Sequence, residues 1–114
     1  MSFEDLGVWK RAVRLSAGLY KDLGDLRDFG FKDQLTRAGL SIASNIAEGM
    51  ERESVRDRTH YLTVAKSSCG ELRTQVHIGI DVGYIDAGLG EQWINESREI
   101  SAMLVGLIRS QRRC

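Results

Sequence analysis

Five polar side chains recur along one stretch of the sequence at spacings of four, four, three and four residues. They are Arg37, Ser41, Asn45, Glu48 and Arg52. On a helix this spacing places them on one stripe. The stripe adjoins a seam of apolar and small residues, which are Leu35, Gly39, Ile42, Ile46 and Gly49. Polar groups so close to a core usually need a hydrogen-bond partner.

Two interpretations of this polar stripe are open. It is either a network that fixes how helices and subunits meet, or a recognition surface for another molecule. We favour the network, because such groups specify register and partner choice more than they add stability. We expect Asn45 to bridge neighbouring helices. We expect Glu48 to pair with Arg52, four residues later, or with an arginine across an interface.

A metal site is another chemistry to test in a helical chain. Di-iron bundles use a glutamate followed three residues later by a histidine, and this sequence has no such pair. His60 and His77 are 17 residues apart, which is roughly 25 Å along one helix, so they cannot bind the same ion. We therefore expect no metal ion and no cofactor.

The sequence also offers little support for nucleophilic catalysis. Cys69 lies on an apolar helical seam, where a thiol normally serves as a small hydrophobic side chain, and Cys114 is the terminal residue. The glycine-containing stretch GYIDAGLG lacks the lysine and the preceding strand of a phosphate-binding loop. No catalytic residue is predicted, and the chain is not expected to be an enzyme.

Two groups of arginines are candidate nucleic-acid contacts, because phosphate neutralisation by basic side chains drives such binding. The first group is Arg52, Arg56 and Arg58, and the second is Arg109, Arg112 and Arg113. Glutamates and an aspartate dilute the first group, and no aromatic residue is interleaved with either to stack on a base. Solvated helix ends are the favoured explanation. We expect the two groups at opposite ends of the molecule, with the C-terminus beside Arg27 and Lys32.

Four amphipathic segments must position these residues. Apolar periodicity predicts helices over residues 3–24, 29–52, 55–82 and 89–111, with Ser2, Ser54 and Asp86 as caps. In the first helix the predicted buried seam is Leu6, Trp9, Val13, Ser16, Tyr20 and Leu23, widened by Ala12, Leu15 and Leu19. Short connections and no strand-like alternation predict one domain over residues 1–114, an all-α up-down-up-down four-helix bundle.

Composition limits the classes of partner. The 114 residues carry 16 basic and 16 acidic side chains, so no overall field favours nucleic acid or an acidic membrane. No apolar run approaches the roughly 20 residues of a membrane-spanning helix, and the N-terminus does not resemble a secretory signal. The two cysteines follow no metal or redox spacing. We expect a cytoplasmic protein with free thiols.

Glycines inside the predicted helices need an explanation. They are Gly18, Gly39, Gly70, Gly79 and Gly106. Each costs a helix roughly 0.5–1 kcal/mol relative to alanine. Close approach of two helix backbones would account for that cost, and drift on a stable bundle is the alternative.

Three stretches together resemble a known bacterial family. They are FEDLGVWKRAVRL, DFGFKDQLTRAGLSIASNIAEGMERES and YLTVAKSSCGELRTQV, of which SIASNIAEG is the most specific segment. The chain resembles the four-helix-bundle proteins encoded in intervening sequences of 23S ribosomal RNA genes. The resemblance implies a homopentameric ring, no established enzymatic activity, and kinship with the basic, nucleic-acid-binding accessory protein of diversity-generating retroelements. This chain departs from the family pattern in having no proline and one arginine, rather than two, before Ala38.

The sequence thus predicts a non-enzymatic, oligomeric assembly or adaptor module. Its expected partners are copies of itself and, as a further candidate, another protein. The alternative is an accessory protein that binds RNA or DNA through basic patches on the ring. The favoured hypothesis rests on apolar residues beyond those needed for one intramolecular seam, and the alternative rests on the arginine groups and the family kinship.

Overall fold

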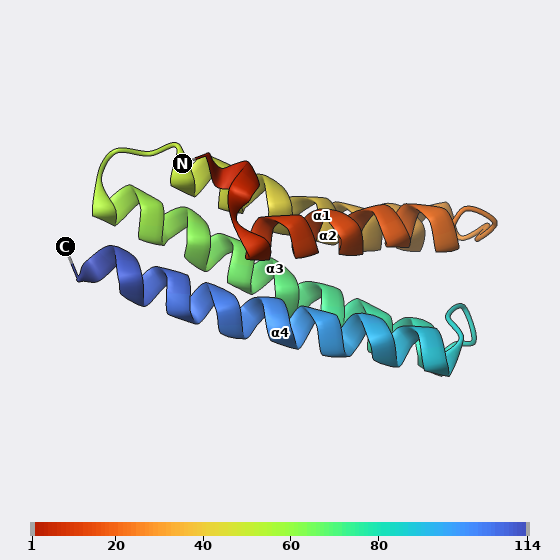
Figure 1. Ribbon diagram of the computed structural model, residues 1–114. Coiled ribbons are helices and arrows are strands. Elements are labelled where there is room, and N and C mark those ends of the chain that lie inside the picture. Colours follow the sequence, from red (N-terminus) through yellow and green to blue (C-terminus); the bar gives the residue numbers. More distant parts are fainter. Residues whose placement is uncertain (1, 114) are drawn as a thin grey trace.

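Four long helices form an antiparallel bundle in the computed structural model, which describes residues 2–113 (Figure 1). A 3₁₀ turn at Phe3–Asp5 precedes α1 (Gly7–Asp22), α2 (Phe29–Met50), α3 (Val55–Asp81) and α4 (Ala87–Arg112). The molecule measures 47 × 20 × 19 Å. Helices that follow one another in the chain pack side by side, and α1 meets α4 along a sparser closing seam.

Side-chain caps fix where the helices begin. Asp28, Ser54 and Asp86 accept hydrogen bonds from backbone N–H groups in the first turns of α2, α3 and α4, which satisfies donors that have no partner inside the helix. The left-handed backbone of Gly83, with φ of +83°, shapes the connection between α3 and α4.

The first helix is shorter than its sequence predicts. Ser2 caps only the 3₁₀ turn, and the extended backbone of Leu6 separates that turn from α1. This break lets the Phe3 ring pack edge-on against Trp9, with ring centroids 5.5 Å apart. The first few residues therefore pack beside the C-terminal end of α2, near Met50, instead of extending α1.

The core runs along the whole bundle and is mainly apolar, with four buried hydroxyl residues, Ser16, Thr36, Ser68 and Ser97. Its largest fully buried aliphatic side chains come from all four helices; they are Leu19, Leu35, Ile42, Ile46, Leu62, Leu72, Val76, Ile94, Ile100 and Leu104. Burial of this size is the main source of stability in a domain of this length.

The buried face of α1 confirms most of the predicted seam, including Ser16, Leu23 and the widening residues Ala12, Leu15 and Leu19, and departs from it at two positions. Its core side chains are Val8, Ala12, Leu15, Leu19 and Leu23. Val13 and Tyr20, which the heptad places in the core, are 37% and 51% exposed. The apolar surface of α1 is wider than α2 and α4 can cover together, so one edge of it stays outside.

The helical glycines fall into two groups. A Cβ atom on Gly39 would lie 2.5 Å from Cδ1 of Leu19, and one on Gly79 would collide with Ile85, so both glycines permit close packing. A Cβ atom on Gly18 or Gly106 would meet nothing within 4 Å, and one on Gly70 would meet only the end of Arg73. Close backbone approach inside the protomer therefore explains Gly39 and Gly79 but not the other three.

Gly18→Ala and Gly106→Ala are each expected to raise the free energy of unfolding by about 0.5–1 kcal/mol, because alanine restricts the unfolded chain and fits the helix. Urea denaturation provides the measurement. Gly39→Ala is the control and is expected to lower stability, since Leu19 is fully buried and has no free space to move into. Destabilisation by Gly18→Ala and Gly106→Ala would contradict this account.

The C-terminal end of α4 lies at the same end of the bundle as the connection between α2 and α3 (Figure 1). The sequence-based expectation, which placed the C-terminus beside Arg27 and Lys32 at the opposite end, is wrong. In an antiparallel bundle α2 and α4 run in the same direction, so their C-terminal ends meet at one end. Thr63 and Lys66 of α3 accordingly share a hollow with Arg109 and Arg112 of α4.

The opposite end is closed by a contact between its two connections. The Tyr84 hydroxyl donates to Oδ2 of Asp28 at 2.9 Å, and the Tyr84 ring packs against Phe31 with centroids 5.4 Å apart. The hydrogen bond from the backbone N–H of Phe31 is the main cause that lowers the pKa of Asp28, and the hydrogen bond from the Tyr84 hydroxyl adds to it.

No helix within residues 2–113 combines the length and apolarity needed to cross a membrane.

Candidate functional site

The middle of the polar stripe forms a hydrogen-bonded chain between α2 and α3. Asn45 Nδ2 donates to the Ser41 carbonyl at 2.8 Å and to Ser41 Oγ at 3.0 Å. Ser41 Oγ lies 2.9 Å from Ser68 Oγ, which donates to the carbonyl of Val64. Because each hydroxyl has one proton, Ser41 is the donor to Ser68. The bridge to α3 is therefore made by Ser41, while Asn45 bonds within its own helix.

The C-terminal end of the stripe is a small cluster around Arg52. Its guanidinium forms an ion pair with Glu48, donates to the Tyr61 hydroxyl at 3.2 Å, and lies 4.9 Å from the centre of the Tyr61 ring. The hydrogen bond to Glu48 is the main cause that raises the pKa of Arg52. The cluster connects the end of α2 to the first turns of α3.

The other end of the stripe is solvated. Arg37 pairs with Asp33 at 2.9 Å, and both side chains are well exposed. An exposed pair of this kind contributes little to stability. The stripe is thus half-buried at Ser41 and Asn45 and open to solvent at Arg37.

The structure brings the two arginine groups to one end of the bundle but uses their members differently. Arg58 donates through Nε to the Arg52 carbonyl at 2.7 Å, so it closes the turn after α2. Arg56 and Arg113 are exposed. Arg109 and Arg112 line the hollow between α3 and α4, which has a volume of about 230 Å³.

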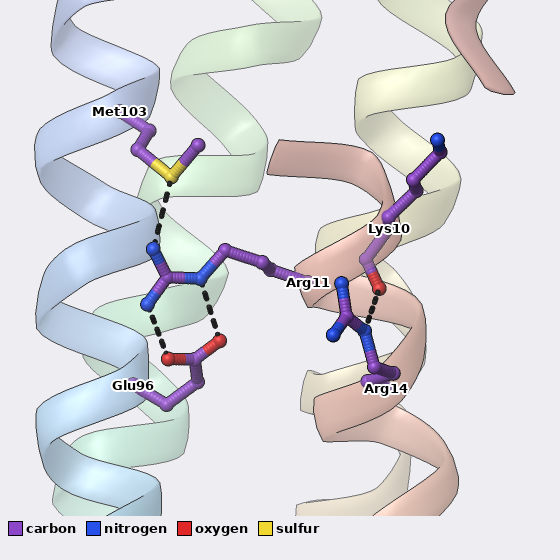
Figure 2. A network of polar contacts seen from close by, with 5 residues as sticks. All are labelled: Lys10, Arg11, Arg14, Glu96 and Met103. Atoms are coloured by element: carbon purple, nitrogen blue, oxygen red, sulfur yellow. Dashed lines mark hydrogen bonds and ion pairs between the residues drawn. The ribbon is translucent and has the colours of Figure 1, made fainter. Parts of the chain in front are cut away.

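An ion pair that sequence reasoning did not find connects α1 with α4 (Figure 2). Arg11 donates to Glu96 through Nε at 2.9 Å and through Nη2 at 2.5 Å, while Nη1 lies 3.6 Å from Sδ of Met103. Both charged side chains are about two-thirds buried. The bidentate geometry makes this the most directional contact on the sparse closing seam.

This contact predicts a pH dependence. The hydrogen bond from Arg11 is the main cause that lowers the pKa of Glu96, and burial opposes it. A carboxyl with a lowered folded-state pKa adds stability above its unfolded-state pKa, and that stability is lost as pH falls through the folded-state value. We expect Glu96→Gln to cost on the order of 1 kcal/mol at pH 7.

Urea denaturation of Glu96→Gln and of the unchanged chain, at pH 7 and again below pH 3, tests this dependence. The difference between them should be smaller at the acidic pH, because protonation of Glu96 removes the charge that Arg11 binds. A difference of equal size at both pH values would show that Glu96 acts through packing and not through its charge.

A second contact absent from the sequence-based prediction holds α3 to α4. Arg73 Nη1 donates to the hydroxyls of Ser97 and Ser101 at 3.0 and 3.2 Å. Ser97 is fully buried and donates to the carbonyl of Cys69 at 3.1 Å. Burial raises the pKa of the Cys69 thiol, so this cysteine is a packing residue and not an activated nucleophile.

The described part of the chain contains no cluster of side chains that could bind a metal ion. Within residues 2–113 no three side chains from histidine, cysteine, aspartate and glutamate gather as a metal would require. His60 packs edge-on against Tyr61 with ring centroids 5.0 Å apart, and His77 is exposed. Cys114 lies outside the described residues.

Comparison with known proteins settles the family. Residues 4–106 match the family described as 23S rRNA-intervening sequence protein. The chain belongs to this family. The resemblance carried by SIASNIAEG and its flanking stretches is thereby confirmed.

A solved structure gives the fold of this 23S rRNA-intervening sequence family member independent support. It is a protein with unknown function from the S23 ribosomal protein family of Bacteroides thetaiotaomicron, with a TM-score of 0.84 and 24% sequence identity. The alignment covers 89% of this chain and 97% of that one. At such identity the likeness shows a shared four-helix fold alone. No curated protein matches the chain.

Proposed function

We propose that this family member is a non-enzymatic assembly or adaptor module that associates with copies of itself into a homopentameric ring. The observation that carries the proposal is a set of exposed apolar side chains on α1 and α2, two of which, Tyr20 and Phe29, line a hollow between these helices. We call this surface the α1–α2 groove; its exposed apolar side chains are Val13, Tyr20, Phe29 and Leu40.

Four large apolar side chains are exposed in the α1–α2 groove, which is more than scattered single surface residues would give. Phe29 is 69% exposed and Leu40 is 49% exposed. One end of the groove opens into a hollow of about 460 Å³, lined by Tyr20, Gly24, Phe29, Lys32, Asp33 and Thr36. Contiguous apolar surface of this kind is typical of an interface between proteins.

A second apolar patch lies at the C-terminal end of α3, where Ile78 and the C-cap residue Val82 are 50% and 57% exposed. Four residues separate them, so they share one face of the helix. We call this pair the α3 patch. A ring with an odd number of subunits needs two different surfaces that meet head to tail, and the groove and the α3 patch supply such a pair. The balanced net charge of zero keeps repulsion between copies small.

Light scattering on the purified chain tests this proposal. The expected mass is about five times the protomer mass of 12.8 kDa. A mass of one protomer across the accessible concentration range would overturn it.

Nucleic-acid binding is the second candidate function, and one observation favours it. The two arginine groups, expected at opposite ends, lie at the same end of the bundle, where the α2–α3 connection meets the C-terminal end of α4. A ring would repeat this basic end in every subunit, and phosphate contacts add through counterion release. Titration with labelled RNA and DNA across salt concentrations tests it, and the absence of binding at low salt would rule it out.

A further inference from the structure

The outer side of the α3–α4 seam carries several cations that are not neutralised by carboxylates. Lys66 on α3 faces Arg109 and Arg112 on α4 across the hollow of about 230 Å³, with Thr63, Val105 and Ile108 completing its lining. None of the three cations takes part in an ion pair within the described chain. The hollow greatly exceeds the roughly 30 Å³ share of one water molecule in the liquid.

Arg73 extends this basic surface along α3. It follows Lys66 by seven residues, which places it on the same side of the helix roughly 10 Å further along the axis. Its half-buried guanidinium is held by two serine hydroxyls, Ser97 and Ser101, and by no carboxylate. Arg11, Arg37 and Arg52, by contrast, each pair with an acidic side chain.

The acidic residues of the middle of α4 lie on its other side. Glu96 binds Arg11 of α1, and Glu99 also acts on the charge of Arg11. These two acids of α4 therefore act on α1, whereas Arg109 and Arg112 lie against α3. A chain with no net charge thus presents one local groove with a positive potential.

We propose that this α3–α4 groove, formed by Lys66, Arg73, Arg109 and Arg112 with the hydroxyl of Ser101, binds the phosphate backbone of a nucleic-acid strand without reading its sequence. The proposal rests on the second candidate function and names its site. Arginine and lysine are the usual donors to phosphate, and hydroxyl side chains add positioning contacts.

The lining explains why such binding would be independent of sequence. Valine, isoleucine and threonine side chains fill the space between the cations, and no aromatic ring lines the hollow. Recognition of bases in single strands relies on stacking against aromatic side chains. The groove therefore has the groups to hold phosphates and lacks those that would hold a particular base.

Fluorescence anisotropy with a labelled single-stranded oligonucleotide of about 20 nucleotides tests the proposal. Four phosphate contacts predict that the logarithm of the binding constant falls with the logarithm of salt concentration with a slope of about −3. The Lys66→Gln/Arg112→Gln double variant should bind at least tenfold more weakly, with a slope smaller in magnitude by about 1.4. Lys10→Gln/Lys21→Gln, which removes two exposed charges from α1, is the matched control and should bind like the unchanged chain.

Three outcomes would overturn the proposal, and they separate the site from the function. If the unchanged chain fails to bind at low salt, both the groove and the nucleic-acid function fail. If Arg56→Gln abolishes binding while the double variant retains it, nucleic acid binds at the α2–α3 connection and the groove assignment fails. If polyglutamate of equal charge competes as well as the oligonucleotide, the groove does not select phosphate. Circular dichroism of each variant verifies that the helices are intact.

Discussion

Replacing Ile46 with alanine is expected to lower the free energy of unfolding by about 2–5 kcal/mol. Ile46 is fully buried in α2 and packs into the single core of the bundle. Deleting its side-chain carbons loses transfer free energy and leaves a cavity that the surrounding helices fill only partly. A change of this size is a large fraction of the stability of a small domain.

Ile78→Ala removes the same atoms from the α3 patch and is the matched control. Half of that side chain is exposed, so we expect a change within about 0.5 kcal/mol in the stability of the protomer. Urea denaturation of both variants at several protein concentrations provides the measurement, because stability that depends on assembly changes with concentration. Equal losses at the two positions would contradict the assignment of Ile78 to the surface of the protomer.

Leu40→Glu and Val82→Glu are each expected to dissociate the proposed ring into protomers. The first places a charge in the α1–α2 groove and the second in the α3 patch, and burying an unpaired charge at an interface costs far more than an exposed apolar contact returns. Light scattering should report the mass of one protomer for either variant. Circular dichroism should report unchanged helicity, since both positions are about half exposed.

Ala102→Glu is the control that tests whether dissociation depends on where the negative charge is placed. Ala102 is an exposed position of α4, outside both the α1–α2 groove and the α3 patch. The same added charge should leave the mass of the assembly unchanged there. Dissociation by Ala102→Glu would show that negative charge anywhere on the surface breaks the assembly, and the two proposed surfaces would lose their support.

Local features of the fold are well determined by the sequence. Ser54 and Asp86 cap the helices where a short polar side chain precedes an apolar period. Cys69 is the small buried residue that its place on the α3 seam predicts. These features depend on residues a few positions apart, which is the range over which helical spacing carries information.

Features that depend on the whole bundle are less accessible from the sequence. Val13 and Tyr20 fit the heptad of α1, and only the positions of α2 and α4 decide that these two side chains stay exposed while Ala12 and Leu15 are buried. Arg11 and Glu96 are 85 residues apart, and nothing near either residue identifies the other. Arg73 similarly finds its serine partners on a different helix.

The polar stripe has one feature that the sequence predicts and one that it does not. Its spacing identifies a shared face of α2, and Glu48 does pair with Arg52. The bond across to α3 depends on Ser68, whose side chain meets Ser41 only after the two helices pack. Whether this stripe also helps to select subunits is a prediction that assembly measurements on variants of Ser41 and Asn45 would test.

The central claim is that two different surfaces of this chain meet head to tail, and mixing the two dissociated variants tests it most directly. Leu40→Glu retains the α3 patch, and Val82→Glu retains the α1–α2 groove. An equimolar mixture can therefore form one intact contact but cannot close a ring. Sedimentation equilibrium should report a heterodimer of about twice the 12.8 kDa protomer mass, with each variant alone remaining a protomer. A mixture that stays at the protomer mass at every accessible concentration would contradict the account.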